Sequence, residues 1–120
     1  MSESNLQNVV AVLPVVDHAA AMAWYEKWIG RAADVVPMEG IAEWRVAENA
    51  WIQVSAADPE PAGKTSVVIG VADIDTQRST CEAAGVTVGE VNDYGFIKTA
   101  AAVDPAGNTI LFVQEMEQEG

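Results

Sequence analysis

Few side chains in this sequence could carry out covalent chemistry. His18 is the single histidine and Cys81 the single cysteine. His18 directly follows Asp17, and neighbouring helical positions point in different directions, so the two would not act as a pair. No serine or cysteine is placed to serve His18 as a nucleophile. We expect His18 to be an exposed helix residue. We expect Cys81, on the same helix face as Ile74, to pack in the core.

A second group of side chains suits non-covalent binding. Aromatic rings stack on flat ligands and their faces attract cations, while nearby carboxylates add negative charge. The candidates are Trp44, Trp51, Tyr94, Phe96, Glu43 and Asp93. For Trp44 and Trp51 a second interpretation is equally open, namely packing between a sheet and a helix. Alternation along a strand does not say which face is which.

The first half of the chain predicts a strand, a helix and three more strands. The strands are expected over residues 8–15, 32–36, 41–46 and 50–55. Asp17 is expected to cap the helix, which runs to Ile29 and ends at Gly30. Its apolar stripe consists of Ala21, Trp24, Tyr25 and Trp28.

The second half repeats this order. Strands are predicted over residues 66–71, 86–91, 96–103 and 109–114, with a loop over 92–95. A helix capped by Asp73 is expected to reach residue 84. The last two strands form a hairpin around the turn sequence Asp104-Pro105-Ala106-Gly107-Asn108. The final strand is apolar on both faces, which places it deep in a sheet.

This internal repeat predicts an α+β protein made of two βαβββ modules. The first module covers residues 8–56 and the second residues 65–114, and the segment 57–64 is a linker with two prolines. A sheet of this kind with one helix leaves its other face open, so two modules can curve around a shared space. We expect residues 1–120 to form a single domain.

Two stretches resemble the vicinal-oxygen-chelate superfamily, which holds glyoxalases, ring-cleaving dioxygenases and bleomycin-resistance proteins. One runs Val15-Val16-Asp17, then Ala23-Trp24-Tyr25-Glu26 and Ile29-Gly30, and the other is the closing Asp104-Pro105-Ala106-Gly107-Asn108. The resemblance implies paired modules that form a cupped mixed sheet. It also implies a homodimer whose ligand cleft is shaped by both chains. Length and acidity are closest to the bleomycin-resistance, drug-binding branch.

Enzymes of that superfamily usually hold a divalent metal between the first and fourth strands of each module. By position, the resemblance places those ligands at Val10, Gln53, Ser66 and Leu111. Valine and leucine have no lone pair to offer, and one amide with one hydroxyl makes a poor site for zinc, nickel or iron. We therefore expect neither a metal nor another cofactor.

The charge and the ends of the chain suggest the kind of partner. With 18 acidic and 6 basic residues the formal net charge is −12, so phosphate backbones would be repelled and nucleic acid is not an expected partner. A cationic small molecule would be attracted, although the acidity could also serve solubility alone.

No apolar run reaches the roughly 18 residues of a membrane span. The polar N-terminus shows no signal peptide, which favours the cytoplasm, and the acidic C-terminal tail is expected to be solvated.

Three functional hypotheses remain open. The first is a non-catalytic protein that sequesters a cationic or planar aromatic antibiotic, such as a bleomycin-type glycopeptide. Its expected ligand-binding residues are Trp44, Trp51, Gln53, Ser66, Tyr94, Phe96, Glu43 and Asp93. The second is a metal-independent or divergent enzyme of the same superfamily. The third is an interaction domain whose cup is filled by its own side chains.

Overall fold

The computed structural model describes residues 5–116, so the polar N-terminus and the acidic tail lie largely outside the described chain. The first half contains β1 (Val9–Val15), α1 (His18–Ile29), β2 (Val35–Met38), β3 (Ile41–Ala47) and β4 (Ala50–Ala56). The second half contains β5 (Ser66–Gly70), α2 (Ile74–Ala83), β6 (Asn92–Asp93), β7 (Ile97–Val103) and β8 (Thr109–Glu115). The predicted α+β order of two βαβββ units is confirmed.

Each half of the described chain forms its own four-stranded mixed sheet. The strand order is β1-β4-β3-β2 in the first sheet and β5-β8-β7-β6 in the second. β1 runs parallel to β4 and β5 parallel to β8, because a helix crosses over between β1 and β2 and between β5 and β6. The last strand, β8, lies between β5 and β7, in the interior position that its apolar sequence predicted.

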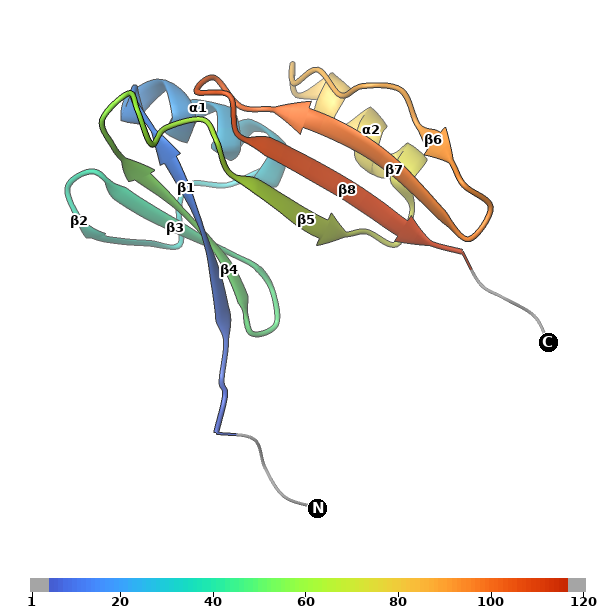
Figure 1. Cartoon of the computed structure of the whole chain (residues 1–120), viewed down its shortest axis with the longest axis horizontal. Coiled ribbons are helices and arrows are strands. Elements are labelled where there is room, and N and C mark those ends of the chain that lie inside the picture. The colour runs from blue at the N-terminus through green and yellow to red at the C-terminus, as the bar shows by residue number, and fades with distance from the viewer. Residues whose placement is uncertain (1–4, 117–120) are drawn as a thin grey trace.

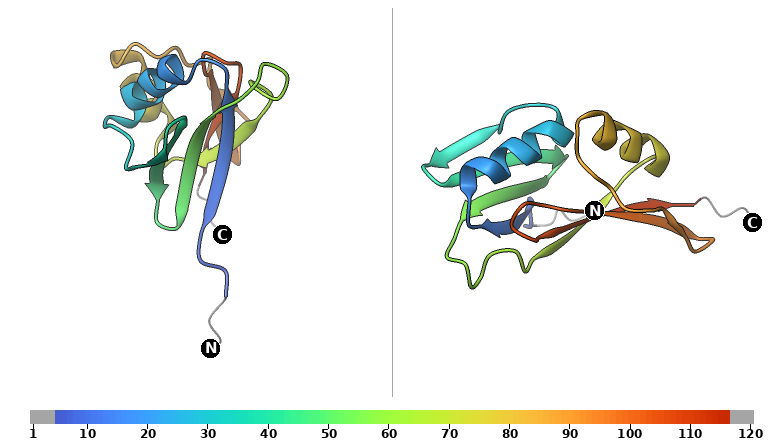
Figure 2. Two further views of the ribbon diagram at one scale, coloured as in Figure 1. Left: turned by 90° about the vertical axis from the view of Figure 1, so that its left-hand side faces the viewer. Right: turned by 90° about the horizontal axis from the view of Figure 1, so that it is seen from above.

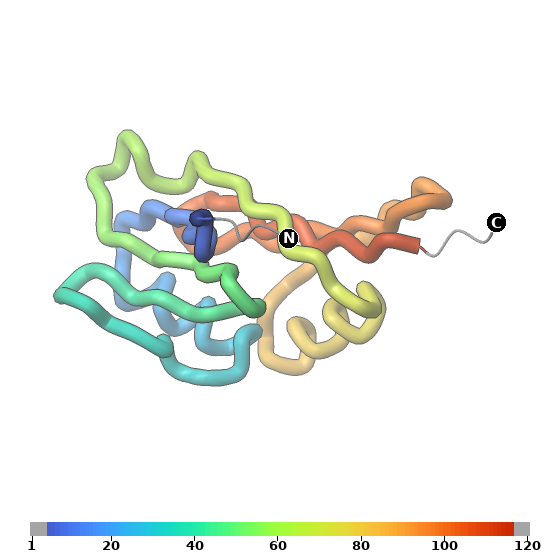
Figure 3. The backbone as a smooth tube through the Cα atoms, turned by 90° about the horizontal axis from the view of Figure 1, so that it is seen from below, coloured from blue at the N-terminus to red at the C-terminus, as the bar shows by residue number. Residues whose placement is uncertain are grey.

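Both helices lie on the same side of the strands. Figure 1 shows the two sheets side by side with the helices behind them, and the views from above and below show the same division (Figures 2 and 3). We call the sheet face toward the helices the inner face and the opposite one the open face. Inner-face residues such as Leu13, Val54 and Phe112 are buried in one hydrophobic cluster that spans both halves.

The helix caps follow the sequence prediction. The Asp17 carboxylate accepts a hydrogen bond from the Ala20 N–H at 3.0 Å, and Asp73 does the same for Thr76 at 3.0 Å. α1 ends at Gly30, whose φ of 89° is the left-handed conformation that glycine adopts without strain. Within the described residues, neither helix is long and apolar enough to cross a membrane.

One predicted strand is wrong. Residues 86–91 form no ladder, and the edge strand of the second sheet is instead β6, at residues that the sequence assigned to a loop. Val86 and Val88 are still buried, so the apolar pattern of this segment indicated burial in the core and not strand pairing. Gly89 donates its N–H to the Ala101 carbonyl, while its own carbonyl accepts from Arg78 Nε and not from a strand.

A buried polar joint connects the two halves at the closing turn. Asp104 is 3% exposed, and one of its oxygens accepts from the Tyr25 hydroxyl at 2.7 Å. The other oxygen accepts three backbone N–H groups of the turn. Asn108 extends the joint, since its Nδ2 donates to the Pro14 carbonyl and its Oδ1 accepts from the Thr65 N–H. The turn that closes the hairpin therefore also fastens the second half to α1 and β1.

Candidate ligand-binding face

The open face of the first sheet carries an ordered grid of side chains. Strand pairing places residues of β1, β4 and β3 in three cross-strand rows. From one end to the other these rows are Val10–Trp51–Arg45, Val12–Gln53–Glu43 and Pro14–Ser55–Ile41. Residues in adjacent rows lie roughly 6.7 Å apart along each strand. The grid thus brings an aromatic ring, a carboxylate and an amide together on a surface with no helix over it.

A chain of hydrogen bonds links the polar members of the grid. Gln53 Nε2 donates to Glu43 Oε2 at 2.7 Å, and the Ser55 hydroxyl donates to Gln53 Oε1 at 2.7 Å. All three residues are half-buried. We refer to Glu43, Gln53 and Ser55 as the polar row. Its members hold one another in place, so the surface presents fixed polar groups.

Trp51 and Trp44 lie on opposite faces of the first sheet. Trp51 is half-buried on the open face, next to the polar row. Trp44 is 0% exposed on the inner face, its ring centroid 6.0 Å from that of Tyr25. Its indole N–H donates to the Arg31 carbonyl at 3.0 Å. Trp44 is therefore a core residue, which removes it from the candidate ligand-binding set.

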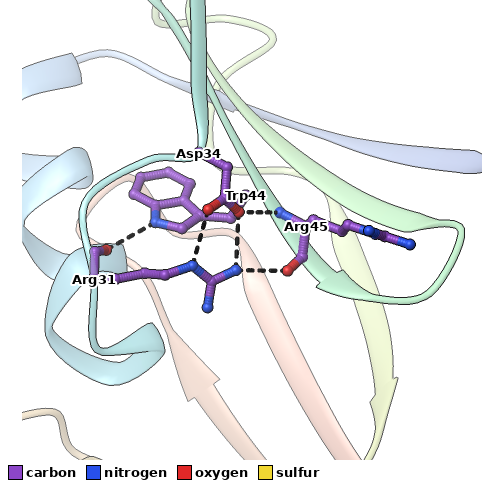
Figure 4. A network of polar contacts seen from close by, with 4 residues as sticks. All are labelled: Arg31, Asp34, Trp44 and Arg45. Carbon is purple, nitrogen blue, oxygen red and sulfur yellow. Dashed lines mark hydrogen bonds and ion pairs between the residues drawn. The ribbon is translucent and has the colours of Figure 1, made fainter.

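The Trp44 bond belongs to a network that holds the segment after α1 against β3 (Figure 4). Arg31 donates to both oxygens of Asp34 at 2.9 and 2.8 Å, and the Arg45 backbone N–H donates to the same carboxylate at 2.7 Å. The Arg31 hydrogen bonds, followed by the Arg45 N–H, lower the pKa of Asp34 from 3.8 to about 2. This network fixes the segment after α1 against β3, the strand that carries Glu43 and Arg45.

The candidates of the second half lie elsewhere. Ser66 is exposed at the start of β5, opposite Thr109. Asp93, Tyr94 and Phe96 surround the β6–β7 turn, at the end of the molecule away from the first sheet (Figure 1). Asp93 accepts from the Gly95 N–H at 2.8 Å, which stabilises that turn. The fold of one chain therefore does not bring these four residues to the polar row.

Ser55, His18 and Cys81 are the remaining polar or reactive side chains whose positions can be compared with the sequence prediction. Ser55 was missed, although its place two residues after Gln53 on one strand was the signal that could have found it. His18 is half-buried and not exposed, because its Nε2 lies 3.0 Å from the Val54 carbonyl. Cys81 is buried, as predicted, and burial raises the pKa of its thiol.

The residues at the superfamily's metal positions do not fit a divalent metal. Strand pairing places Val10 and Gln53 on the open face of the first sheet, and Ser66 and Leu111 on that of the second. Two of the four carry no donor atom, and the Gln53 oxygen already accepts the Ser55 hydroxyl. Within residues 5–116, no three His, Cys, Asp or Glu side chains gather as a metal site requires.

Comparison with solved structures identifies the fold. A glyoxalase/bleomycin resistance protein from Catenulispora acidiphila DSM 44928 superposes with a TM-score of 0.85 at 27% sequence identity. The match covers 91% of this chain and 98% of that one. The chain has the glyoxalase/bleomycin-resistance fold. This is the fold of the vicinal-oxygen-chelate superfamily that the two sequence stretches resemble.

Other proteins with the glyoxalase/bleomycin-resistance fold are similar over nearly their whole length. A bleomycin-binding protein from Streptomyces verticillus, complexed with copper(II)-bleomycin, has a TM-score of 0.76 and 23% identity, covering 96% of this chain and 100% of that one. TnmS3, an antibiotic binding protein from Streptomyces sp. CB03234, has a TM-score of 0.77 and 20% identity, covering 97% and 99%. No family model and no curated protein matches the sequence.

Proposed function

We propose that this protein binds and sequesters a small cationic or planar aromatic molecule without transforming it. The observation that carries the proposal is the open face of the first sheet, where Trp51 stands beside the polar row. These side chains point away from the helices and the core, so a guest can reach them from the open face. A ring next to a carboxylate suits a flat, positively charged guest, because the ring supplies stacking and the carboxylate supplies charge.

Electrostatics support the same ligand class. The formal net charge of −12 attracts cations to the surface and concentrates them near the sheet. Glu43 forms no ion pair within the described residues, so its charge is available to a guest. Since the face is open to water, salt should screen this attraction.

Two of the similar structures support an antibiotic as the guest. One was solved with copper(II)-bleomycin and another is named as an antibiotic binding protein. Both share the fold at low identity, so they support the chemical class and not a particular drug. We propose bleomycin-type glycopeptides as the class, since they combine positive charge with flat heteroaromatic rings.

We also propose that two copies of the chain assemble each binding cleft. Valines stand exposed on the open faces of both sheets: Val12 is 45% exposed on the first, and Val68 64% and Val103 58% on the second. Covering such apolar surface is favourable by roughly 25 cal/mol per Å². If the second sheet of a partner faces the first sheet of this chain, the candidates of the second half join the polar row. That arrangement would unite Ser66, Asp93, Tyr94 and Phe96 with Trp51.

Calorimetric titration with copper(II)-bleomycin and with metal-free bleomycin tests the binding proposal. We expect a dissociation constant in the micromolar range or tighter at low salt, weaker binding at high salt, and quenching of tryptophan fluorescence. Trp51→Ala should weaken binding by about tenfold or more, which is the loss of roughly 1.4 kcal/mol. Absence of both heat and quenching at low salt would refute the proposal.

Sedimentation velocity tests the two-chain cleft separately. We expect the mass of a dimer for the unaltered protein. Val68→Lys, which places a charge in the middle of an exposed apolar strand face, should shift the protein toward monomer while leaving its circular dichroism unchanged. A monomer at micromolar concentration would contradict the assembly, whatever the titrations show.

A further inference from the structure

A groove lies between the two sheets, at the end of the first sheet that the helices do not cover. Its volume is about 210 Å³. The start of β1 and the β3–β4 hairpin form one wall, and β5 forms the other. Figures 1 and 2 show the start of β1 and this hairpin extending beyond α1. Val9 is 70% exposed and Val68 64% exposed, one on each wall, so a molecule from solution can reach the groove.

Small residues make room for the groove. On β1 the inner-face residue Leu13 is fully buried, whereas Ala11, two positions earlier, is half-buried and lines the groove. On β4 the same step leads from Ile52, which is 1% exposed, to Ala50. On the opposite wall, a Cβ at Gly70 would meet a single atom within 4 Å, a backbone oxygen. The sequence thus keeps space between the sheets where larger apolar side chains would close it.

The lining of the groove is apolar throughout. None of its eleven lining residues carries a charge, a hydroxyl or an amide in its side chain, and the indole N–H of Trp51 is the single polar side-chain group among them. A charged group that entered would lose water without gaining a polar partner, which is unfavourable. Apolar surface that enters is removed from water, which is favourable. The groove therefore suits an uncharged guest.

The volume of the groove limits the size of that guest. An apolar cavity of roughly 150 Å³ holds a benzene molecule. The groove, at about 210 Å³, has room for one or two fused rings. Trp51 lines the groove and also borders the polar row on the open face. A molecule with an apolar ring in the groove could therefore extend past Trp51 toward the open face.

We propose that this groove is a binding subsite for an uncharged aromatic group of one or two rings, carried by a small molecule. The inference goes beyond the proposed function, because it assigns a second site with a different preference. The groove lies within one chain, so it requires neither the charge of Glu43 nor a second copy. A guest with both a cationic and an apolar part would use the open face for one and the groove for the other.

Titration of the full-length protein with naphthalene, followed by the amide signals in NMR spectra, tests the inference. We expect shifts at Val9, Ala50 and residues 67–70, with a dissociation constant of roughly 100 µM, from the usual affinity per atom of small ligands. Raising the ionic strength about tenfold should change this constant by less than about twofold, because no charge takes part. A cationic guest on the open face should instead bind more weakly as salt is added.

Variants that fill the groove assign the binding to it. Ala50→Leu places a larger side chain in the groove and should weaken naphthalene binding by about tenfold or more. Ala47→Leu is a second filling variant at an exposed lining residue, and should weaken binding by about threefold or more. Ala56→Leu adds the same atoms at the opposite, exposed end of β4 and should leave binding unchanged. Circular dichroism and thermal melting establish which variants fold.

The outcomes separate this inference from the proposed function. No binding of naphthalene up to its solubility, shifts confined to other residues, or undiminished binding in the filling variants that fold overturns the inference, even if bleomycin binds. A second copy that covers the groove would also prevent binding and overturn it. Naphthalene binding that the filling variants weaken supports the inference even if bleomycin produces no heat. In that case the proposed drug class fails while the apolar subsite stands.

Discussion

The hydrogen bond between Tyr25 and Asp104 gives the sharpest test of how the two halves are held together. Tyr25→Phe removes a hydroxyl that donates at 2.7 Å to a carboxylate that is 3% exposed. A hydrogen bond to a charged group contributes about 1.5–3 kcal/mol. The same Asp104 oxygen keeps its bond from Asn108 Nδ2 at 2.9 Å, so the carboxylate is not left bare. We therefore expect a loss of about 2 kcal/mol in the free energy of unfolding.

Chemical denaturation at pH 7 measures this loss. For a chain of 120 residues the same change should lower the melting temperature by about 6–10 °C. Tyr94→Phe is the matched control, because Tyr94 is the only other tyrosine and is 59% exposed. It should change stability by less than about 0.5 kcal/mol. If Tyr25→Phe costs no more than Tyr94→Phe, the joint does not hold the halves together and the reasoning is wrong.

The alkaline limb of the stability curve gives a second readout of the same bond. Burial, and then the bond to Asp104, raises the pKa of Tyr25 above its ordinary value of 10.0. The folded protein therefore keeps the phenol proton while the unfolded chain releases it above about pH 10. The stabilisation is complete below that pH and falls as the pH rises further. The Tyr25→Phe variant lacks the phenol, so its free energy of unfolding should fall less steeply above about pH 10 than that of the unaltered protein. If the two proteins lose stability equally over that pH range, the pKa of Tyr25 is not raised.

Two further predictions concern the acid limb and the linker. Because the pKa of Asp34 is lowered from 3.8 to about 2, its contribution to stability is present above pH 4 and is lost as the pH falls toward 2. Denaturation at pH 5 and pH 2.5 should show a smaller drop for Asp34→Asn than for the unaltered protein, and equal drops would refute the assignment. A Cβ at Gly63 would lie 2.0 Å from the Ala106 carbonyl oxygen, and its φ of +76° is already unfavourable for alanine. Gly63→Ala should destabilise by about 2 kcal/mol more than Gly85→Ala, whose φ of +86° is similar but whose Cβ meets nothing within 4 Å. If Gly63→Ala and Gly85→Ala have the same melting temperature, the approach of the Ala106 carbonyl to position 63 does not exclude a Cβ.

The open face was only partly predictable. Glu43 and Trp51 were named from their types and their place on adjacent predicted strands, and Gln53 from the family resemblance. The fold sets the three side by side. Trp44 was named on the same grounds and lies in the core. The two tryptophans look alike in sequence because a strand alternates between faces with a period of two. Which face the helix covers is decided by packing.

The second-half candidates show a different limit. Tyr94 and Phe96 lie at a turn distant from the first sheet in one chain, and residues 86–91 pack without pairing. Short apolar runs bury equally well as strands or as extended segments, so composition does not separate the two. β6 forms the edge strand of the second sheet, because Asn92 and Asp93 pair with Thr99 and Lys98 of β7.

The sequence by itself determined where the two helices begin and where α1 ends, because capping and helical periodicity act over a few residues. Asp17, Asp73 and Gly30 therefore sit in the predicted roles. Only the tertiary structure decided which side of each sheet is open, and that Asp104 reaches across the molecule to Tyr25. Contacts between residues 79 positions apart depend on how the two halves dock. No local pattern in either segment contains that information.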